Sequence, residues 1–214
     1  MSRQKVEPSD KNFIEWINGN HLLRNYYLKT LSFDSEDIDN QSFDPVTATN
    51  SIIQEYDFIG TTERMEHSAV ALQLLLGLST EDILFLNAKS SGGFDDGADD
   101  VSGCTYIVPS FVSKGMRAYF GGNVWKQYTR MDRLLFLAAN RSLDLTIERL
   151  GRDRFEDALA KYRSAQQQVK EQCASTVVFP CSSSGEKAAH PDCFWADSGC
   201  GMGCLDEVSR TLQK

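Results

Sequence analysis

The chain has 214 residues, of which 41% are hydrophobic and 24% charged, and its formal net charge is -8. This composition is typical of a soluble protein with a substantial core, and the acidic balance argues against a general nucleic-acid binder, which needs a basic surface. No apolar run approaches the length of a membrane span, and no apolar signal segment follows residues 1–5. We therefore expect one large soluble domain, or two small ones, with no nucleic-acid partner, no membrane span and no targeting signal.

Two short helices are predicted near the N-terminus. Ser9 or Asp10 can cap the first, whose inward face would be Phe13, Trp16 and Ile17. Residues 26–31 are apolar enough for the second. Residues 32–50 are acidic and rich in turn-forming residues, which predicts a surface loop with a turn at Asp44 and Pro45.

The centre of the chain, residues 52–78, is the stretch around which the rest is organised. The apolar and aromatic run at 56–59 predicts a buried strand, and Gly60 allows a sharp turn. Thr61 or Thr62 can then cap a helix that has Glu63 in its first turn. The helix is expected to be buried on most of its circumference, through a stripe of Met65, Ala69, Leu72 and Leu76 that Val70, Leu74 and Leu75 widen.

A second strand is predicted at residues 83–86, and it defines the expected fold class. A strand, a helix and another strand in this order favour parallel pairing with a right-handed crossover. The sequence therefore predicts an α/β fold with few parallel strands, in which helices predominate.

The loop after the second predicted strand is a candidate phosphate-binding site, since open α/β sheets bind ligands beyond the carboxyl ends of their strands. Its residues are Lys89, Ser90, Ser91, Gly92 and Gly93. Backbone N–H groups and one ammonium could cradle an anion there, or the loop could simply be solvated. The four aspartates between positions 95 and 100 could hold calcium or face water, and they lack the EF-hand order.

Two long helices are predicted in the C-terminal half, after an irregular aromatic stretch at 101–130. The first begins at Asp132 and ends at Gly151, with an apolar stripe of Phe136, Ala139, Leu143, Ile147 and Leu150. The second follows at once, with one face made of Phe155, Ala158, Leu159, Tyr162, Ala165 and Val169.

Six cysteines are present, and five of them lie in the last 42 residues: Cys104, Cys173, Cys181, Cys193, Cys200 and Cys204. Such clustering suggests disulfides in an oxidising compartment or a metal site. No pair has the two-residue spacing common in structural zinc sites, so disulfides are favoured over zinc, with the pairing open. We expect the tail, 173–206, to be held by its cysteines.

Three segments resemble one family. YDFIGTTERM at 56–65, followed by a leucine-rich helix, resembles the strand-to-helix segment of Golgi carbohydrate sulfotransferases, and above all the uronyl and heparan 2-O-sulfotransferase branch with its algal and protist relatives. MDRLLFLAAN at 131–140 is similar to a late helix of that family, and DSGCGMGCLD at 197–206 to a cysteine-containing extension of its algal members. The likeness covers roughly residues 11 to 206.

The resemblance implies a partial P-loop fold and transfer of a sulfuryl group from 3'-phosphoadenosine 5'-phosphosulfate (PAPS) to a hydroxyl of a carbohydrate or another acceptor. It places the chain in the Golgi lumen or secretory pathway, with residues 89–93 on the donor's 3'-phosphate. The family's phosphosulfate-binding loop and catalytic base precede the segment at 56–65, and nothing in this sequence matches them. The resemblance thus predicts the C-terminal part of such an enzyme, inactive alone, with no catalytic residue of its own and with an upstream half as a partner.

Two functions therefore stand against each other. One is the sulfotransferase portion, with residues 1–170 in its domain and a cysteine-rich tail at 171–214 packed on it. The alternative is a disulfide-stabilised lumenal binding or accessory domain without catalysis.

Overall fold

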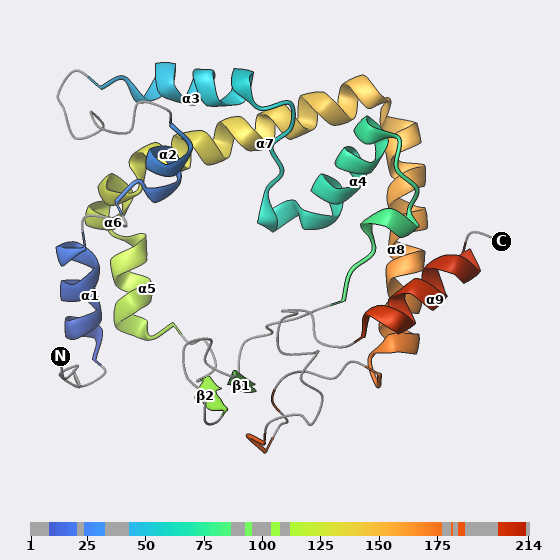
Figure 1. Ribbon diagram of the computed structural model, residues 1–214. Helices are drawn as coiled ribbons and strands as arrows, with labels where there is room; N and C mark the ends of the chain where they lie inside the picture. The colour runs from blue at the N-terminus through green and yellow to red at the C-terminus, as the bar shows by residue number, and fades with distance from the viewer. Residues whose placement is uncertain are drawn as a thin grey trace. The chain divides into compact units, whose positions relative to one another are not determined.

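The computed structural model describes residues 9–20, 24–32, 43–86, 93–95, 104–107, 112–176, 181, 184–186 and 201–212. Helices predominate in these residues (Figure 1). The α-helices are α1 (Asp10–Gly19), α2 (Tyr26–Leu31), α3 (Pro45–Glu55), α4 (Met65–Leu76), α5 (Lys114–Gly121), α6 (Asn123–Tyr128), α7 (Arg130–Leu150), α8 (Arg152–Cys173) and α9 (Met202–Leu212). Two 3-10 turns, η3 (Thr62–Arg64) and η4 (Glu81–Ile83), flank α4, and two strands, β1 (Gly93–Asp95) and β2 (Thr105–Ile107), pair with each other.

The chain forms two compact units. The first comprises Met1–Met65 and Phe111–Thr146, and the second Glu66–Ser110 and Ile147–Lys214. The division of the chain at residue 170 stays a prediction.

The core of the first unit lies where α2 and α3 meet α7. Leu28, Ile52 and Leu135 are buried there, one from each helix. The half-buried residues Leu31, Phe43, Ile59 and Met131 pack around them. The sequence thus marks where each helix forms, and the contacts between helices in this core stabilise them. This is expected for a helix as short as α2, which is not stable alone.

Asn25 and Asp132 tie α2 and α7 together by capping each other's helix. Asn25 has a left-handed backbone (φ 50°), and its side-chain oxygen accepts a hydrogen bond from the Met131 N–H at 3.0 Å. Asp132 accepts from the Leu28 N–H at 2.9 Å. Each side chain thus satisfies an N–H that would otherwise lack an acceptor at a helix start.

Burial raises the pKa of the Asp132 carboxyl, and the backbone N–H groups of residues 26–28 act in the opposite direction. Because the folded pKa exceeds the unfolded one, this carboxyl's contribution to stability is complete at pH below the unfolded pKa and is lost as pH rises through the folded pKa. We expect Asp132→Asn to keep the acceptor and remove this dependence. In urea unfolding series between acid and neutral pH, the variant should gain stability relative to the natural chain as pH rises.

Asp132→Ala should instead lose the acceptor at every pH, at a cost of about 1 kcal/mol. A constant difference between natural chain and Asn variant across the pH series would contradict the role assigned to the carboxyl's burial.

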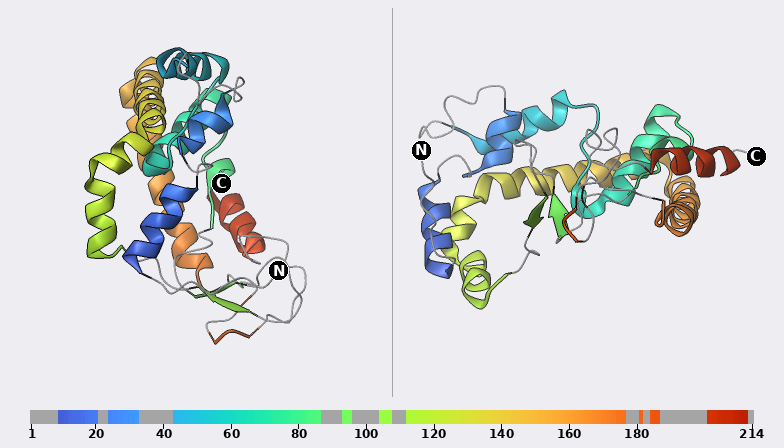
Figure 2. Two further views of the ribbon diagram at one scale, coloured as in Figure 1. Left: turned by 90° about the vertical axis from the view of Figure 1, so that its left-hand side faces the viewer. Right: turned by 60° about the horizontal axis from the view of Figure 1, so that its bottom comes forward.

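Helices α1, α5 and α6 lie near one another within the first unit (Figure 2), and aromatic rings join them. Phe13 meets Phe120 edge-on at 6.0 Å between ring centroids, and Phe120 meets Trp125 at 5.0 Å. Trp125 stacks on Tyr128, whose hydroxyl donates to the carbonyl oxygen of Asn20 at 2.6 Å. The prediction of an irregular stretch at 101–130 is therefore wrong from residue 114 onward, because these rings stabilise two helices too short to be recognised by periodicity.

The predicted loop at 32–50 is also wrong at its end, where α3 begins. Asp44 caps α3 by accepting hydrogen bonds from the N–H groups of Val46 and Thr47, at 3.0 and 3.3 Å. Pro45 occupies the first helical position, where its missing N–H costs nothing. Asp44 and Pro45, which were predicted to form a turn, therefore begin a helix.

The predicted strand at 56–59 does not form. These residues connect α3 to η3 without a sheet partner, and Ile59 packs on the core of the first unit. Ile59 is therefore used for side-chain packing and not for strand pairing, and Tyr56 of the same run is exposed. A helical turn does begin where predicted, with Thr61 extended before η3 and Glu63 in the first turn, but the Thr61 hydroxyl makes no capping hydrogen bond.

The predicted strand at 83–86 does not form either. Ile83 ends η4, and the following residues have no strand partner. The backbone of Phe85 bonds instead to the side-chain amide of Gln166 on α8: its N–H donates to Oε1 at 3.3 Å and its carbonyl accepts from Nε2 at 2.7 Å. A side chain of the second unit thus takes the place that a neighbouring strand would have.

We expect Gln166→Ala to lower the free energy of unfolding by about 1 kcal/mol, because both backbone groups of Phe85 exchange this partner for water. Gln167→Ala is the matched control, since Gln167 is exposed and its Nε2 donates to Glu171 on the same helix at 2.7 Å. It should change stability by less than about 0.5 kcal/mol. Chemical denaturation of the two variants compares them directly, and equal effects would contradict the role of Gln166.

The strand pairing in the described residues is antiparallel and local. Gly93 of β1 lies opposite Ile107 of β2, and Asp95 opposite Thr105. The expected parallel crossover between 56–59 and 83–86 is therefore wrong, whereas the expected predominance of helices is confirmed.

The second unit is built on α8, whose predicted apolar face is confirmed. Five of the six predicted residues are buried, namely Phe155, Leu159, Tyr162, Ala165 and Val169, and Cys173 is buried as well, whereas Ala158 is half-buried. The expected stripe of α4 is wrong, because Met65 and Leu76 are 48% and 64% exposed. Of the wider predicted stripe only Val70 is buried, and the helix otherwise buries Ser68, Ala71 and Gln73. The Glu66 carboxylate pairs with the Arg163 guanidinium of α8 at 2.8 Å, which fixes the face of α4 that meets α8.

Candidate functional site

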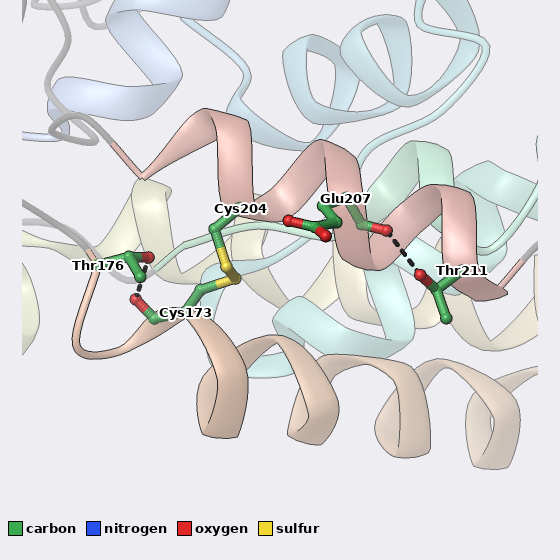
Figure 3. The surroundings of a disulfide bond; sticks show 5 residues. All are labelled: Cys173, Thr176, Cys204, Glu207 and Thr211. Atoms are coloured by element: carbon green, nitrogen blue, oxygen red, sulfur yellow. Dashed lines mark hydrogen bonds between the residues drawn. A yellow bond between two sulfur atoms is a disulfide. The ribbon is translucent and has the colours of Figure 1, made fainter.

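Two disulfides connect distant segments of the second unit. Cys173 at the end of α8 joins Cys204 in the first turn of α9 (Figure 3). Cys104, just before β2, joins Cys181. These bonds confirm the expectation of disulfides and indicate an oxidising environment, such as the secretory pathway or the extracellular space.

The first of these bonds is shielded from solvent on one side, and its Cys204 is half-buried. Cys173 is fully buried, and its carbonyl oxygen accepts hydrogen bonds from the N–H and the hydroxyl of Thr176, both at 3.0 Å. On α9, Leu205 and Val208 are buried. The zinc alternative is wrong for these cysteines, because sulfurs joined in disulfides are not thiolate ligands. Cys193 and Cys200 lie outside the described residues.

A cleft with a volume of about 490 Å³ lies between α4, the residues before η4, and α8. Its lining residues are Gln73, Leu74, Thr80, Arg154, Asp157, Ala158 and Lys161. All of them belong to the second unit. This is within the size range of small-molecule sites.

One wall of the cleft is a charged stripe on α8. Arg154, Asp157 and Lys161 stand three and four residues apart, so their side chains leave the same face of the helix. All three are exposed, and no ion pair joins any of them to another of the residues that the structure describes. Their charges therefore stand in the order positive, negative, positive along one face of the helix, each next to a charge of opposite sign.

The opposite wall contributes a buried amide. Gln73 is only 6% exposed, and its Nε2 donates to the Thr80 hydroxyl at 3.3 Å. Its Oε1 is buried and has no hydrogen-bond partner in the described part of the chain. A buried carbonyl group without a partner costs free energy, so its presence at the edge of the cleft needs an explanation.

These groups suit recognition of a polar, charged ligand. Two cations can bind an anionic group, a carboxylate can accept from an ammonium or hydroxyl, and Leu74 and Ala158 supply apolar contact. Among the described residues, no three side chains of His, Cys, Asp or Glu gather in a way that could hold a metal ion.

The phosphate-binding loop predicted from the sequence is not part of this cleft as far as it is described. Lys89, Ser90, Ser91 and Gly92 lie outside the described residues, as do Asp96, Asp99 and Asp100. Gly93 begins β1 and lies opposite Ile107. The role of residues 89–93 stays a prediction.

Sequence reasoning missed the residues of the cleft. Charges three and four residues apart on the polar face of a helix are ordinary for a solvated surface, so Arg154, Asp157 and Lys161 gave no signal. Gln73 lay within an expected apolar helix. Only the packing of α4 on α8 brings these side chains to one place.

Two further findings bear on the class of protein. In the described ranges, we find no helix with the length and apolar character needed to cross a bilayer. Comparison of the chain with protein-family models, with curated proteins and with solved structures finds no match.

Proposed function

We propose that this chain is a disulfide-braced binding module of the secretory pathway or extracellular space, and that the cleft between α4 and α8 is its ligand site. The module is an accessory domain whose work is recognition and not catalysis. The observation that carries the proposal is the joint presence, in one cleft, of three charged side chains without ion-pair partners among the described residues and the buried amide of Gln73.

The two disulfides support the same proposal. They connect α8 to α9 and the β2 segment to Cys181, all within the unit that contains the cleft. Cross-links of this kind hold a small domain together where its core alone is modest. A rigid frame reduces the ordering cost of binding.

The test is nuclear magnetic resonance of the isotopically labelled, oxidised chain with four probe classes at millimolar concentration: neutral sugars, simple carboxylates, amino acids and nucleotides. We expect at least one class to shift the side-chain amide resonances of Gln73 together with backbone resonances of residues 154–161. Lys161→Met should weaken that response, whereas Lys170→Met, an exposed change on the same helix, should leave it intact. Absence of any response near the cleft from all four classes would overturn the proposal.

The second proposal is the one implied by resemblance: the C-terminal portion of a PAPS-dependent carbohydrate sulfotransferase of the Golgi, with a partial P-loop fold completed by an upstream half. What favours it is the segment at 56–65, where a non-helical connection leads through Gly60 into η3 and α4. What weighs against it is that the two stretches expected to form its parallel sheet, 56–59 and 83–86, are not strands.

This second proposal has its own test, which does not involve the cleft. Residues 89–93 would contact the 3'-phosphate of the donor, so 3'-phosphoadenosine 5'-phosphate should raise the melting temperature of the chain. Lys89→Ala should abolish that shift. If the nucleotide does not change the melting temperature of the natural chain, the donor loop loses its support.

A further inference from the structure

The order of the charges along the cleft favours one arrangement of charges in a ligand, beyond a general affinity for anions. Arg154 and Lys161 are seven residues apart on α8, which places their backbones about 10 Å apart along the helix axis. Asp157 stands between them on the same face. A ligand that lies along this stripe meets a cation, then a carboxylate, then a cation.

We infer that the cleft takes a small ligand with the complementary order of charges, two carboxylates on either side of one ammonium, as in an acidic amino acid. This inference rests on the proposed function of the cleft and names its ligand class. The carboxylates would bind the guanidinium of Arg154 and the ammonium of Lys161, and the ligand's ammonium would bind the carboxylate of Asp157.

Asp157 is the residue that discriminates between a dicarboxylate with an ammonium group and one without it. Without it, two cations would bind any dicarboxylate. With it, a dicarboxylate that lacks an ammonium places its carbon chain, and no opposite charge, against the Asp157 carboxylate, and its own carboxylates are repelled. Two unit charges about 4 Å apart in water interact by an amount equal to about a five-fold change in affinity.

The remaining lining residues agree with a ligand of this kind. Leu74 and Ala158 offer apolar contact to the short carbon chain between the carboxylates. The Thr80 hydroxyl, bonded to Gln73, can donate to a carboxylate oxygen that lies at this end of the cleft. Because the three charged side chains are exposed, added salt should weaken the binding.

The experiment compares L-glutamate with glutarate, which has the same two carboxylates and no ammonium, by resonance titration of the oxidised chain. The natural chain should bind glutamate about five-fold more tightly than glutarate. Asp157→Asn should reverse the preference, since it removes an attraction for glutamate and a repulsion for glutarate. L-lysine, with the opposite excess of charge, should bind more weakly than either.

The outcomes distinguish a wrong ligand class from a wrong assignment of the cleft as a binding site. If both compounds bind the natural chain equally and Asp157→Asn changes neither affinity, the ligand class is wrong and the cleft still binds carboxylates. If glutamate, glutarate and lysine all fail while a neutral sugar or a nucleotide shifts the Gln73 amide, the ligand class is wrong and the binding module stands. If no probe of any class acts on the cleft, both fall. Asp153→Asn, which changes an exposed carboxylate outside the cleft, is the matched control and should leave the preference for glutamate unchanged.

Discussion

Replacing both Cys173 and Cys204 by alanine is expected to lower the free energy of unfolding by about 4 kcal/mol. The bond closes a loop with a sequence separation of 31 residues, and its loss frees the unfolded chain from that constraint. It also frees α9, whose buried contacts through Leu205 and Val208 must then hold the helix in place alone. Denaturant unfolding of the double variant under non-reducing conditions measures the change.

The control for this experiment lies on the same helix. The Thr211 hydroxyl donates to the carbonyl oxygen of Glu207 at 3.0 Å and is exposed (Figure 3). Thr211→Ala should alter stability by less than about 0.5 kcal/mol. A loss below about 1 kcal/mol in the cysteine variant would mean that the packing of α9, and not the covalent bond, holds this end of the second unit.

The second large effect is expected for Leu135→Ala, at about 3 kcal/mol. Leu135 is 5% exposed and belongs to the core of the first unit with Leu28 and Ile52. Its truncation removes apolar contacts on all sides and leaves a cavity that the three helices can fill only in part.

Its neighbour Phe136 provides the contrast, because the sequence alone selects Phe136 for the core. The ring is 39% exposed, so Phe136→Ala should cost less than about 1.5 kcal/mol although more atoms are removed. Both variants can be compared by thermal and denaturant unfolding. A larger loss for Phe136 than for Leu135 would show that α7 buries a different face from the one that carries Leu135.

Leu135 and Phe136 also show that helical periodicity alone does not identify every buried residue of α7. The spacing of Ala139, Leu143 and Ile147 correctly predicts the buried face of α7, and all three are buried. Position 136 fits the same spacing as well as position 135 does, within the width of an apolar stripe. The neighbouring helices α2 and α3 decide between them, and a single helical pattern carries no information about those neighbours.

The two predicted strands that do not form have a related physical cause. The runs at 56–59 and 83–86 have the apolar character of buried strands, which requires burial but not a sheet partner. Ile59 obtains its burial from a helical core, and Phe85 obtains its backbone hydrogen bonds from Gln166. A single sequence does not specify which group will accept a hydrogen bond from a given backbone N–H. A buried strand and a packed connection between helices therefore have the same sequence pattern.

The amino-acid sequence by itself determined the local elements of this protein: the cap of α1 at Ser9, the break at Gly151, the apolar face of α8, the predominance of helices and the presence of disulfides. These features depend on neighbours within one or two helical turns, or on residue type alone. The tertiary structure decided which cysteines pair, which face of α4 is buried, and that Gln73 meets the charged stripe of α8 in one cleft. Those outcomes depend on the distances between side chains far apart in the chain, which only the packing of the helices sets.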